Sequence, residues 1–175
     1  MHSVVILGID PGLAHTGWGV IEQAGARCRA LAYGCITTEA HEGIATRLKR
    51  IHDGIVTAIE RYHPSELSIE VVYFGSNSKS AVATCQARGA ALVAAAAWEL
   101  EVGEYSPTQI KRVTVGEGHA DKQQTQYMVK ALLALDHEPA PDHAADALAA
   151  ALCHARLRPL NGLISQSTSR KGIER

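Results

Sequence analysis

The stretch that decides the fold lies near the start of the chain, where residues 3–12 read SVVILGIDPG. The β-branched run from Ser3 to Ile9 is typical of a buried strand, and Asp10-Pro11-Gly12 is typical of a tight turn that ends it. Two further strand-like runs, Thr16 to Ile21 and Ala30 to Thr37, follow after short connections. Three strands joined by short loops predict an antiparallel meander.

After the meander, strand-like and helix-like segments alternate. The longer segments have helical patterns, and shorter β-branched runs separate them. The sequence predicts helices over Gly43 to Tyr62, Lys79 to Leu100, Thr125 to Leu135 and Pro141 to about Leu157, with strands over Leu67 to Tyr73 and Val102 to Tyr105. This order, β-β-β-α-β-α-β-α-α, predicts an α/β fold with a mixed five-stranded sheet and helices on its faces.

Length and composition set the outer limits. A chain of 175 residues fits one domain, expected over residues 1–158, and the polar, unpatterned residues 159–175 are expected to be a disordered tail. The net charge of −1 gives no general indication of nucleic acid or membrane as a partner. The sequence begins with no secretory signal, its apolar runs are too short to span a membrane, and its four cysteines are scattered. These features predict a reduced cytoplasmic protein.

Two carboxylates stand out in the predicted strands. Asp10 follows a buried strand at the position where α/β sheets commonly place ligands, although an aspartate before Pro-Gly can also serve the turn itself. Glu70 interrupts the apolar run Leu67 to Val72, where a buried carboxylate needs a cation, a metal or a hydrogen-bond network as partner. A solvent-facing glutamate on an edge strand is the alternative.

A third acidic group lies in residues 141–147, which read PDHAADA. Pro141 and Asp142 suit the first turn of a helix, so the helix end explains Asp142. On a helical wheel, Asp146 points away from the main apolar stripe, and His143 lies one turn earlier on the same side. Small residues continue this side of the helix, which indicates a face packed against protein or a cleft, and a solvated surface carboxylate is the alternative.

Asp10, Glu70 and Asp146 can converge from two strand ends and a helix. Oxygen ligands without cysteine suit Mg²⁺ or Mn²⁺. Two such ions activate water and stabilise the leaving oxygen in phosphodiester hydrolysis. The residues alone therefore leave metal-dependent hydrolysis and three separate structural carboxylates both open.

Several ordered motifs resemble those of the RuvC family of Holliday junction resolvases. The resemblance extends to about Leu157 and rests on GIDPG (8–12), SIEVV (68–72), QARGAALVAAA (86–96), YSPTQIKRVTVGEG (105–118), DKQQTQYMV (121–129) and HAADALAAALCHA (143–155). It implies a ribonuclease H-like fold and a homodimer that makes paired symmetric nicks in four-way DNA junctions, in recombination and repair. It also implies contacts with the RuvA–RuvB branch-migration complex.

The resemblance further implies that Asp10, Glu70, His143 and Asp146 are the catalytic metal ligands, with two Mg²⁺ or Mn²⁺ ions in each site. Many members have aspartate where this chain has His143. Histidine can ligate Mn²⁺ directly or handle protons, and the resemblance leaves both roles open.

Three further positions match DNA-contacting residues of the family. Tyr73 matches an aromatic residue that stacks on an unpaired base near the crossover, although an aromatic residue at a sheet edge can also pack on the core. Lys111 and Lys122 match basic residues near the cut strand, and their alternative is an ordinary surface lysine.

Three other functions compete with junction resolution. An actin-like ATPase needs a second D-x-G phosphate loop, and this chain has no second one after a strand. A related ribonuclease H-like nuclease that acts on RNA would share the fold and the acidic residues. A catalytically weak junction-binding protein would share the fold, and the histidine at position 143 keeps this alternative in view.

Overall fold

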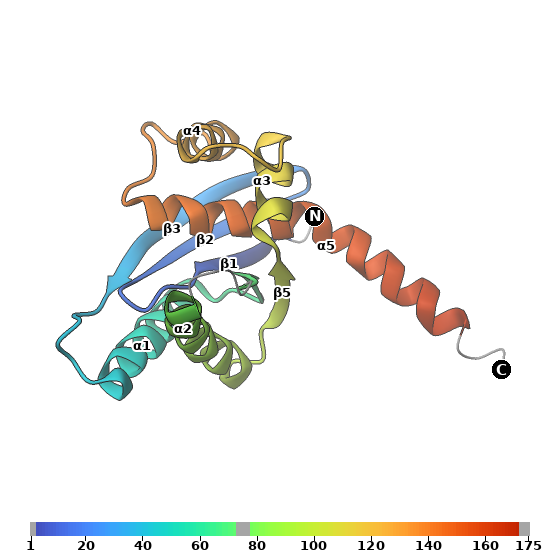
Figure 1. Cartoon of the computed structure of the whole chain (residues 1–175). Helices are drawn as coiled ribbons and strands as arrows, with labels where there is room; N and C mark the ends of the chain where they lie inside the picture. The colour runs from blue at the N-terminus through green and yellow to red at the C-terminus, as the bar shows by residue number, and fades with distance from the viewer. Residues whose placement is uncertain (1–2, 73–77, 172–175) are drawn as a thin grey trace.

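The computed structural model describes residues 3–72 and 78–171, with the side chains of 3–72 and 81–158 (Figure 1). Its sheet has the order β3-β2-β1-β4-β5. The strands are β1 (Val4–Asp10), β2 (His15–Ala24), β3 (Arg27–Thr37), β4 (Glu66–Glu70) and β5 (Glu101–Tyr105). The first three form the predicted antiparallel meander, and β4 and β5 extend it in parallel with β1. The predicted mixed five-stranded sheet is therefore confirmed.

Both faces of the sheet are buried. Successive strand residues point to opposite sides, so one strand contributes side chains to two cores. Ile6 and Ile21 face one core, whereas Leu7, Ile9 and Val20 face the other. The second core is covered by α1 (Ile44–Tyr62) and α2 (Ser78–Ala97), which lie together below the sheet in Figure 1. Burial on both faces fixes the register of the central strands, because a slip by one residue would exchange the two cores.

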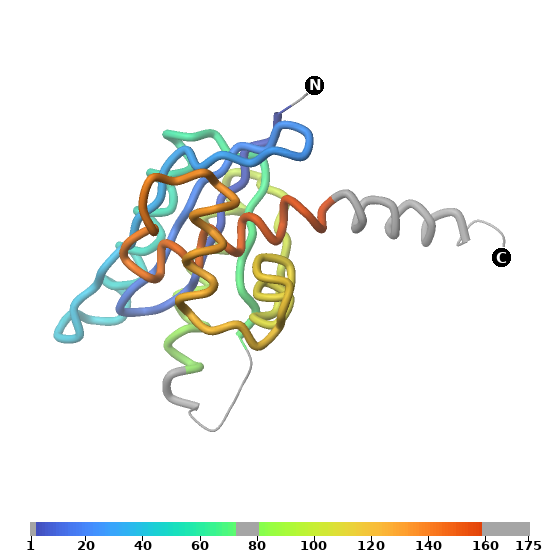
Figure 2. The backbone as a smooth tube through the Cα atoms, turned by 90° about the horizontal axis from the view of Figure 1, so that it is seen from above, coloured from blue at the N-terminus to red at the C-terminus, as the bar shows by residue number. Residues whose placement is uncertain are grey.

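The opposite face is covered by α5 (Asp142–Lys171), which runs across the strands in the view from above (Figure 2). Two glycines let this helix lie directly on the strand backbones. A Cβ atom on Gly8 would come within 2.0 Å of the Ala147 carbonyl oxygen, and one on Gly17 within 1.9 Å of the His143 carbonyl oxygen. The position of α5 is therefore set by backbone contact, without a layer of side chains between helix and strand.

Helix α5 is also held by a buried polar network at the far end of the sheet. Glu66 accepts hydrogen bonds from His154 Nε2, at 2.6 Å, and from Arg158 Nε, at 2.7 Å. The Tyr105 hydroxyl lies 2.8 Å from His154 Nδ1. This network ties α5 to β4 and β5 where the helix leaves the sheet.

Two short helices complete the layer above the sheet. They are α3 (Pro107–Val115) and α4 (Lys122–Leu132). Each begins with a capping box, in which Ser106 pairs with Gln109 and Asp121 pairs with Gln124. A capping box satisfies two backbone N–H groups at the helix start, so each helix begins at a defined residue. Both helices pack on α5.

The helical prediction needs two corrections. Helix α3 was not predicted, although its Ser106-Pro107 start and Gln109 are a helix-start pattern. The last helix was predicted to end near Leu157, whereas the backbone stays helical to Lys171. The pairing of Arg158 with buried Glu66 anchors the helix just past the predicted end, and extending an existing helix costs little.

Among the described residues, no helix is both long enough and apolar enough to cross a membrane.

Candidate active site

The site begins where two neighbouring parallel strands end. Asp10 is the last residue of β1, and Glu70 is the last residue of β4. Ile9 of β1 pairs with Ile69 of β4. Asp10 and Glu70 follow these two residues, so they lie at matching positions on the two strands. Parallel strands present their carboxyl ends at the same edge of a sheet, which is where open α/β sheets bind ligands.

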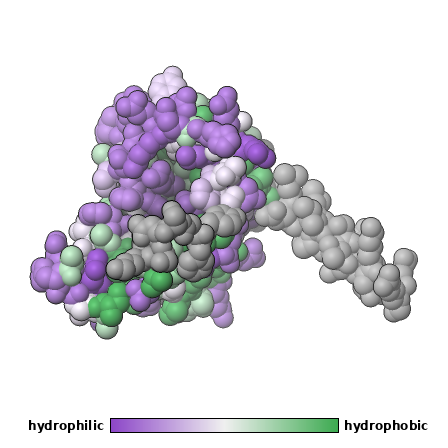
Figure 3. All heavy atoms as spheres, viewed as in Figure 1, coloured by the Kyte–Doolittle hydropathy of each residue, from purple (hydrophilic) through white to green (hydrophobic). Residues whose placement is uncertain are grey.

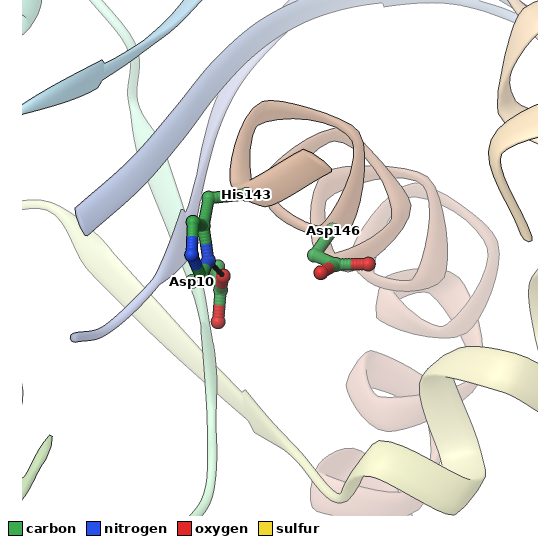
Figure 4. Close-up of side chains that lie close together, drawn as sticks. All are labelled: Asp10, His143 and Asp146. Atoms are coloured by element: carbon green, nitrogen blue, oxygen red, sulfur yellow. Dashed lines mark hydrogen bonds and ion pairs between the residues drawn. The ribbon is translucent and has the colours of Figure 1, made fainter. Parts of the chain in front are cut away.

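The first turns of α5 bring a histidine and a third carboxylate to this edge. The Nδ1 atom of His143 lies 2.7 Å from Oδ2 of Asp10. One possible ligand atom from each of Asp10, His143 and Asp146 lies within 4.8 Å of the others. Figure 4 shows the His143 ring against Asp10 at the end of β1, with Asp146 facing them from α5. The two α5 residues lie on the same side of the helix, as the helical wheel predicts.

The fold makes each of these carboxylates harder to ionise. Burial raises the pKa of Asp10 and outweighs the opposite effect of its hydrogen bond with His143. Burial, and then the negative charge of Asp10, raise the pKa of Asp146. Burial, together with the charges of Asp10 and Asp146, raises the pKa of Glu70 to about 7. A bound cation would relieve this repulsion and restore the ionised forms.

The donor atoms fit a hard divalent cation. The cluster offers carboxylate oxygens and one imidazole nitrogen, which suit Mg²⁺ and Mn²⁺ better than the softer metals that prefer thiolate. Glu70 is outside the group of three whose atoms lie within 4.8 Å of one another, but its carboxyl group senses the charges of Asp10 and Asp146. It therefore lies beside the cluster.

A cleft of about 300 Å³ opens from the acidic site. Glu70 and Asp146 line it on one side, while Lys111 of α3 and Lys122 of α4 bring positive charge. The remaining lining residues are Pro107, Ile110, Thr125 and Ala149. A cleft that joins carboxylates to two lysines can hold a metal ion and a phosphate group side by side.

The predicted site residues have different outcomes. The structure brings Asp10, His143 and Asp146 together, sets Glu70 beside them, and places Lys111 and Lys122 in the adjoining cleft. Tyr73 lies outside the described residues.

Asp142 lies in the first turn of α5, where its negative charge favours the helix end, as predicted. Its carboxylate also lies 3.0 Å from the Lys122 ammonium and accepts a hydrogen bond from Gln126. It therefore links α4 to α5 beside the site.

One neighbour of the site was missed in the sequence. The ring of His15, at the start of β2, stacks on the ring of His143 with centroids 5.5 Å apart and an interplanar angle of 20°. The two residues are far apart in the chain, so no local pattern connects them. Helix α3, which brings Lys111 to the cleft, was also missed, although its capping box is a local signal.

Comparisons with known proteins bear on the fold and the site together. A family model described as crossover junction endodeoxyribonuclease RuvC matches residues 6–154. The crossover junction endodeoxyribonuclease RuvC of Moorella thermoacetica is 48% identical over 156 residues, which cover 89% of this chain and 93% of the relative. That of Heliobacterium modesticaldum is 49% identical over 152 residues, covering 87% and 94%.

A solved structure gives the same result in three dimensions. The structure of T. thermophilus RuvC in complex with a Holliday junction substrate superposes with a TM-score of 0.85 at 35% identity, covering 90% of this chain and 96% of that one. The sheet order and the acidic edge thus define a protein of the ribonuclease H-like class. Within that class, the chain belongs to the RuvC family of crossover junction endodeoxyribonucleases.

Proposed function

We propose that this protein is an endonuclease that resolves four-way DNA junctions by paired symmetric nicks, in DNA recombination and repair. The observation that carries the proposal is the acidic cluster of Asp10, His143 and Asp146 beside a lysine-lined cleft, in a chain whose family match spans residues 6–154. The T. thermophilus relative was solved with a Holliday junction substrate, which supports junction DNA as the partner.

In this proposal, Asp10, Glu70, His143 and Asp146 hold two Mg²⁺ or Mn²⁺ ions and are the catalytic residues. Such ions, when bound, supply a nucleophilic water and stabilise charge on the phosphate. The 2.7 Å hydrogen bond between His143 Nδ1 and Asp10 Oδ2 places the imidazole at the acidic cluster, and a ring nitrogen would become available to the ion once it carries no proton. Glu70, whose pKa is raised to about 7, has to release its carboxyl proton when the site is loaded.

The cleft residues position the DNA. Lys111 and Lys122 would bind phosphates of the cut strand and stabilise the negative charge that develops on the phosphate. Lys122 already lies against Asp142, so its ammonium has to exchange this partner for a phosphate. Tyr73, three residues after Glu70, is proposed to stack on an unpaired base at the crossover.

Paired nicks require two active sites, and α2 offers a surface for a homodimer. Val82 and Val93 are 51% and 62% exposed on this helix, and Gly89 between them faces open space. In Figure 3, hydrophobic residues gather over α1 and α2, whereas the part of the surface over α3 and α4 is mostly hydrophilic. An exposed apolar helix face with small residues favours close packing against a second copy.

The proposal extends to the cellular setting. A cytoplasmic homodimer would receive junctions from the RuvA–RuvB branch-migration complex and cut them in place.

A substrate panel tests this function. The protein is incubated with Mg²⁺ or Mn²⁺ and a labelled four-way junction, a plain duplex of the same sequence, and an RNA–DNA hybrid. We expect symmetric nicks in two strands of like polarity, in the junction alone. Cleavage of the hybrid would favour the RNA-directed alternative, and junction binding without cleavage under either metal would favour a catalytically weak binding protein.

A further inference from the structure

The ring of His15, which is not one of the proposed metal ligands, stacks on the ring of His143, which is one. His15 is exposed, and its ring centroid lies 5.5 Å from that of His143 with the planes inclined by 20°. The geometry is that of offset stacking between aromatic rings, which prefer centroid separations of roughly 4.5–7 Å. The imidazole beside Asp10 is therefore contacted both at a nitrogen and on a ring face.

The backbone that carries His15 is held on both sides. The turn before it is fixed by three hydrogen bonds: Thr16 Oγ1 donates to the Gly12 carbonyl at 2.7 Å, and Thr38 donates from its hydroxyl to Leu13 and from its backbone N–H to Ala14. His15 itself pairs with Thr37 at the start of the β2–β3 ladder. The ring thus projects from a fixed point of the sheet.

The backbone of His143 is fixed against the same strand. Its carbonyl oxygen lies against Gly17, two residues after His15, so closely that a Cβ atom there would come within 1.9 Å. The strand that carries His15 is thus in backbone contact with the turn that carries His143. The relative positions of the two rings follow from this contact, and only side-chain rotation is left to be restrained.

Restraint matters because the His143 ring borders solvent. Its side chain is 39% exposed, compared with 19% for Asp10. A second hollow of about 470 Å³, which shares no lining residue with the first cleft, is lined by His15, Cys35, Thr37, Pro141, Asp142 and His143. Rotation of the His143 imidazole into this hollow would take Nδ1 away from Asp10. His15 lines the hollow and lies against the ring that would rotate.

We propose that His15 is a positioning residue that holds the His143 imidazole, by stacking, in the orientation that offers its nitrogen to the metal site beside Asp10. The inference rests on the proposed metal-ligand role of His143 and adds a residue that acts through it. The effect depends on an aromatic face and needs no charge on His15. Stacking of this kind changes an equilibrium by roughly 2- to 10-fold.

The test measures Mn²⁺ binding to the whole protein without DNA, by isothermal titration calorimetry at about pH 8, where ordinary histidines are neutral. We expect His15→Ala to raise the Mn²⁺ dissociation constant by roughly 2- to 10-fold and His15→Phe to keep it within about 2-fold of the wild type. In a His143→Asp background, His15→Ala should have no effect, because no imidazole is left to orient.

Each other outcome decides against the inference. An unchanged dissociation constant in His15→Ala would overturn it, as would an equal loss in His15→Phe or a loss that persists in the His143→Asp background. Circular dichroism of each variant confirms folding. Because no DNA is cut, a protein that binds Mn²⁺ in the expected pattern but leaves junctions intact would contradict the proposed function and leave this inference standing.

Discussion

Among the individual residues of the site, Glu70 has the most strongly raised pKa. Burial, together with the nearby charges of Asp10 and Asp146, raises its pKa from an ordinary value of 4.5 to about 7. The folded protein therefore holds this proton more tightly than the unfolded chain does. The stability that results is fully present below about pH 4.5 and is lost as the pH rises through about 7.

Replacing this carboxylate should stabilise the metal-free protein at high pH. At pH 8 with a chelator present, Glu70→Gln is expected to raise the free energy of unfolding by on the order of 2 kcal/mol, and at pH 4 to leave it unchanged. Urea denaturation at the two pH values measures both quantities. Glu60→Gln, on the exposed side of α1, is the matched control. An equal gain at both pH values would show that the pKa of Glu70 is not raised.

The imidazole at position 143 gives a second prediction. His143→Asp should still cut junctions, because a carboxylate in that position can also ligate a divalent ion, but the ratio of Mg²⁺-supported to Mn²⁺-supported cleavage should rise by about 10-fold. Cleavage rates at saturating metal check this. Complete loss of cleavage with both metals would indicate that the histidine handles a proton or supports the structure.

The sequence predicts some of these residue-level features better than others. Helical periodicity placed Asp146 away from the main apolar stripe, and the strand ends placed Asp10 and Glu70, but these local patterns left open whether the three carboxylates share one site. The stacking of His15 on His143 depends on how α5 lies over β2, which no local pattern contains. The bridge between Lys122 and Asp142 likewise joins two different helices.

Among the structural elements, the contact between α5 and the strands sets the geometry of the site. Gly17 lets the first turn of α5 touch β2, and Gly8 does the same for β1 one turn further along. Both contacts are with backbone carbonyl oxygens, which cannot move aside as a flexible side chain can. The distance from Asp10 to His143 and Asp146 on α5 therefore depends on having glycine, with no side chain, at positions 8 and 17.

A methyl group added at Gly17 should move the α5 residues of the site away from Asp10. Gly17→Ala is expected to destabilise the protein by about 1–3 kcal/mol and to reduce cleavage by more than 10-fold, because it displaces the turn that carries His143. Thermal unfolding and a cleavage assay on the folded variant measure the two effects. Gly43→Ala at the start of α1, where a Cβ atom meets nothing within 4 Å, is the control that should change neither by much. Wild-type cleavage in Gly17→Ala would contradict the role assigned to this contact.

At this scale the strands and long helices were predictable, and the short helix was not. Long segments such as α1 show their period over many residues, here in the buried Ile51, Ile55 and Ile59, and α1 agrees with the helix predicted over Gly43 to Tyr62. Helix α3 has nine residues and buries only Ile110 and Thr114, so periodicity hardly shows. Its capping box was the available signal.

In the whole molecule, charge and apolar surface are distributed unevenly. The net charge of −1 gives no indication of DNA, yet Lys111 and Lys122 both line the cleft beside the acidic cluster. Composition averages over such local arrangements, and only the fold shows them. The exposed valines of α2 are a second local feature that average hydropathy does not reveal.

The proposed dimer is tested by charging this helix. Val93→Glu should convert a dimer into a monomer, because a carboxylate in the centre of an apolar interface would lose its hydration. Sedimentation equilibrium gives the mass. Ile44→Glu, at a hydrophobic residue 44% exposed on α1, is the matched control and should stay dimeric. A Val93→Glu variant that keeps the mass of a dimer would place the interface elsewhere.

The central claim is that the acidic edge of the sheet cuts junction DNA through bound metal, and Asp10→Asn tests it most directly. Binding of a labelled four-way junction and its cleavage are measured on the same preparation, with Mg²⁺ and with Mn²⁺. We predict binding within about 3-fold of the wild type and cleavage reduced by at least about 100-fold, a loss of about 2.7 kcal/mol in transition-state stabilisation. Symmetric nicking by Asp10→Asn at the wild-type rate would contradict the account.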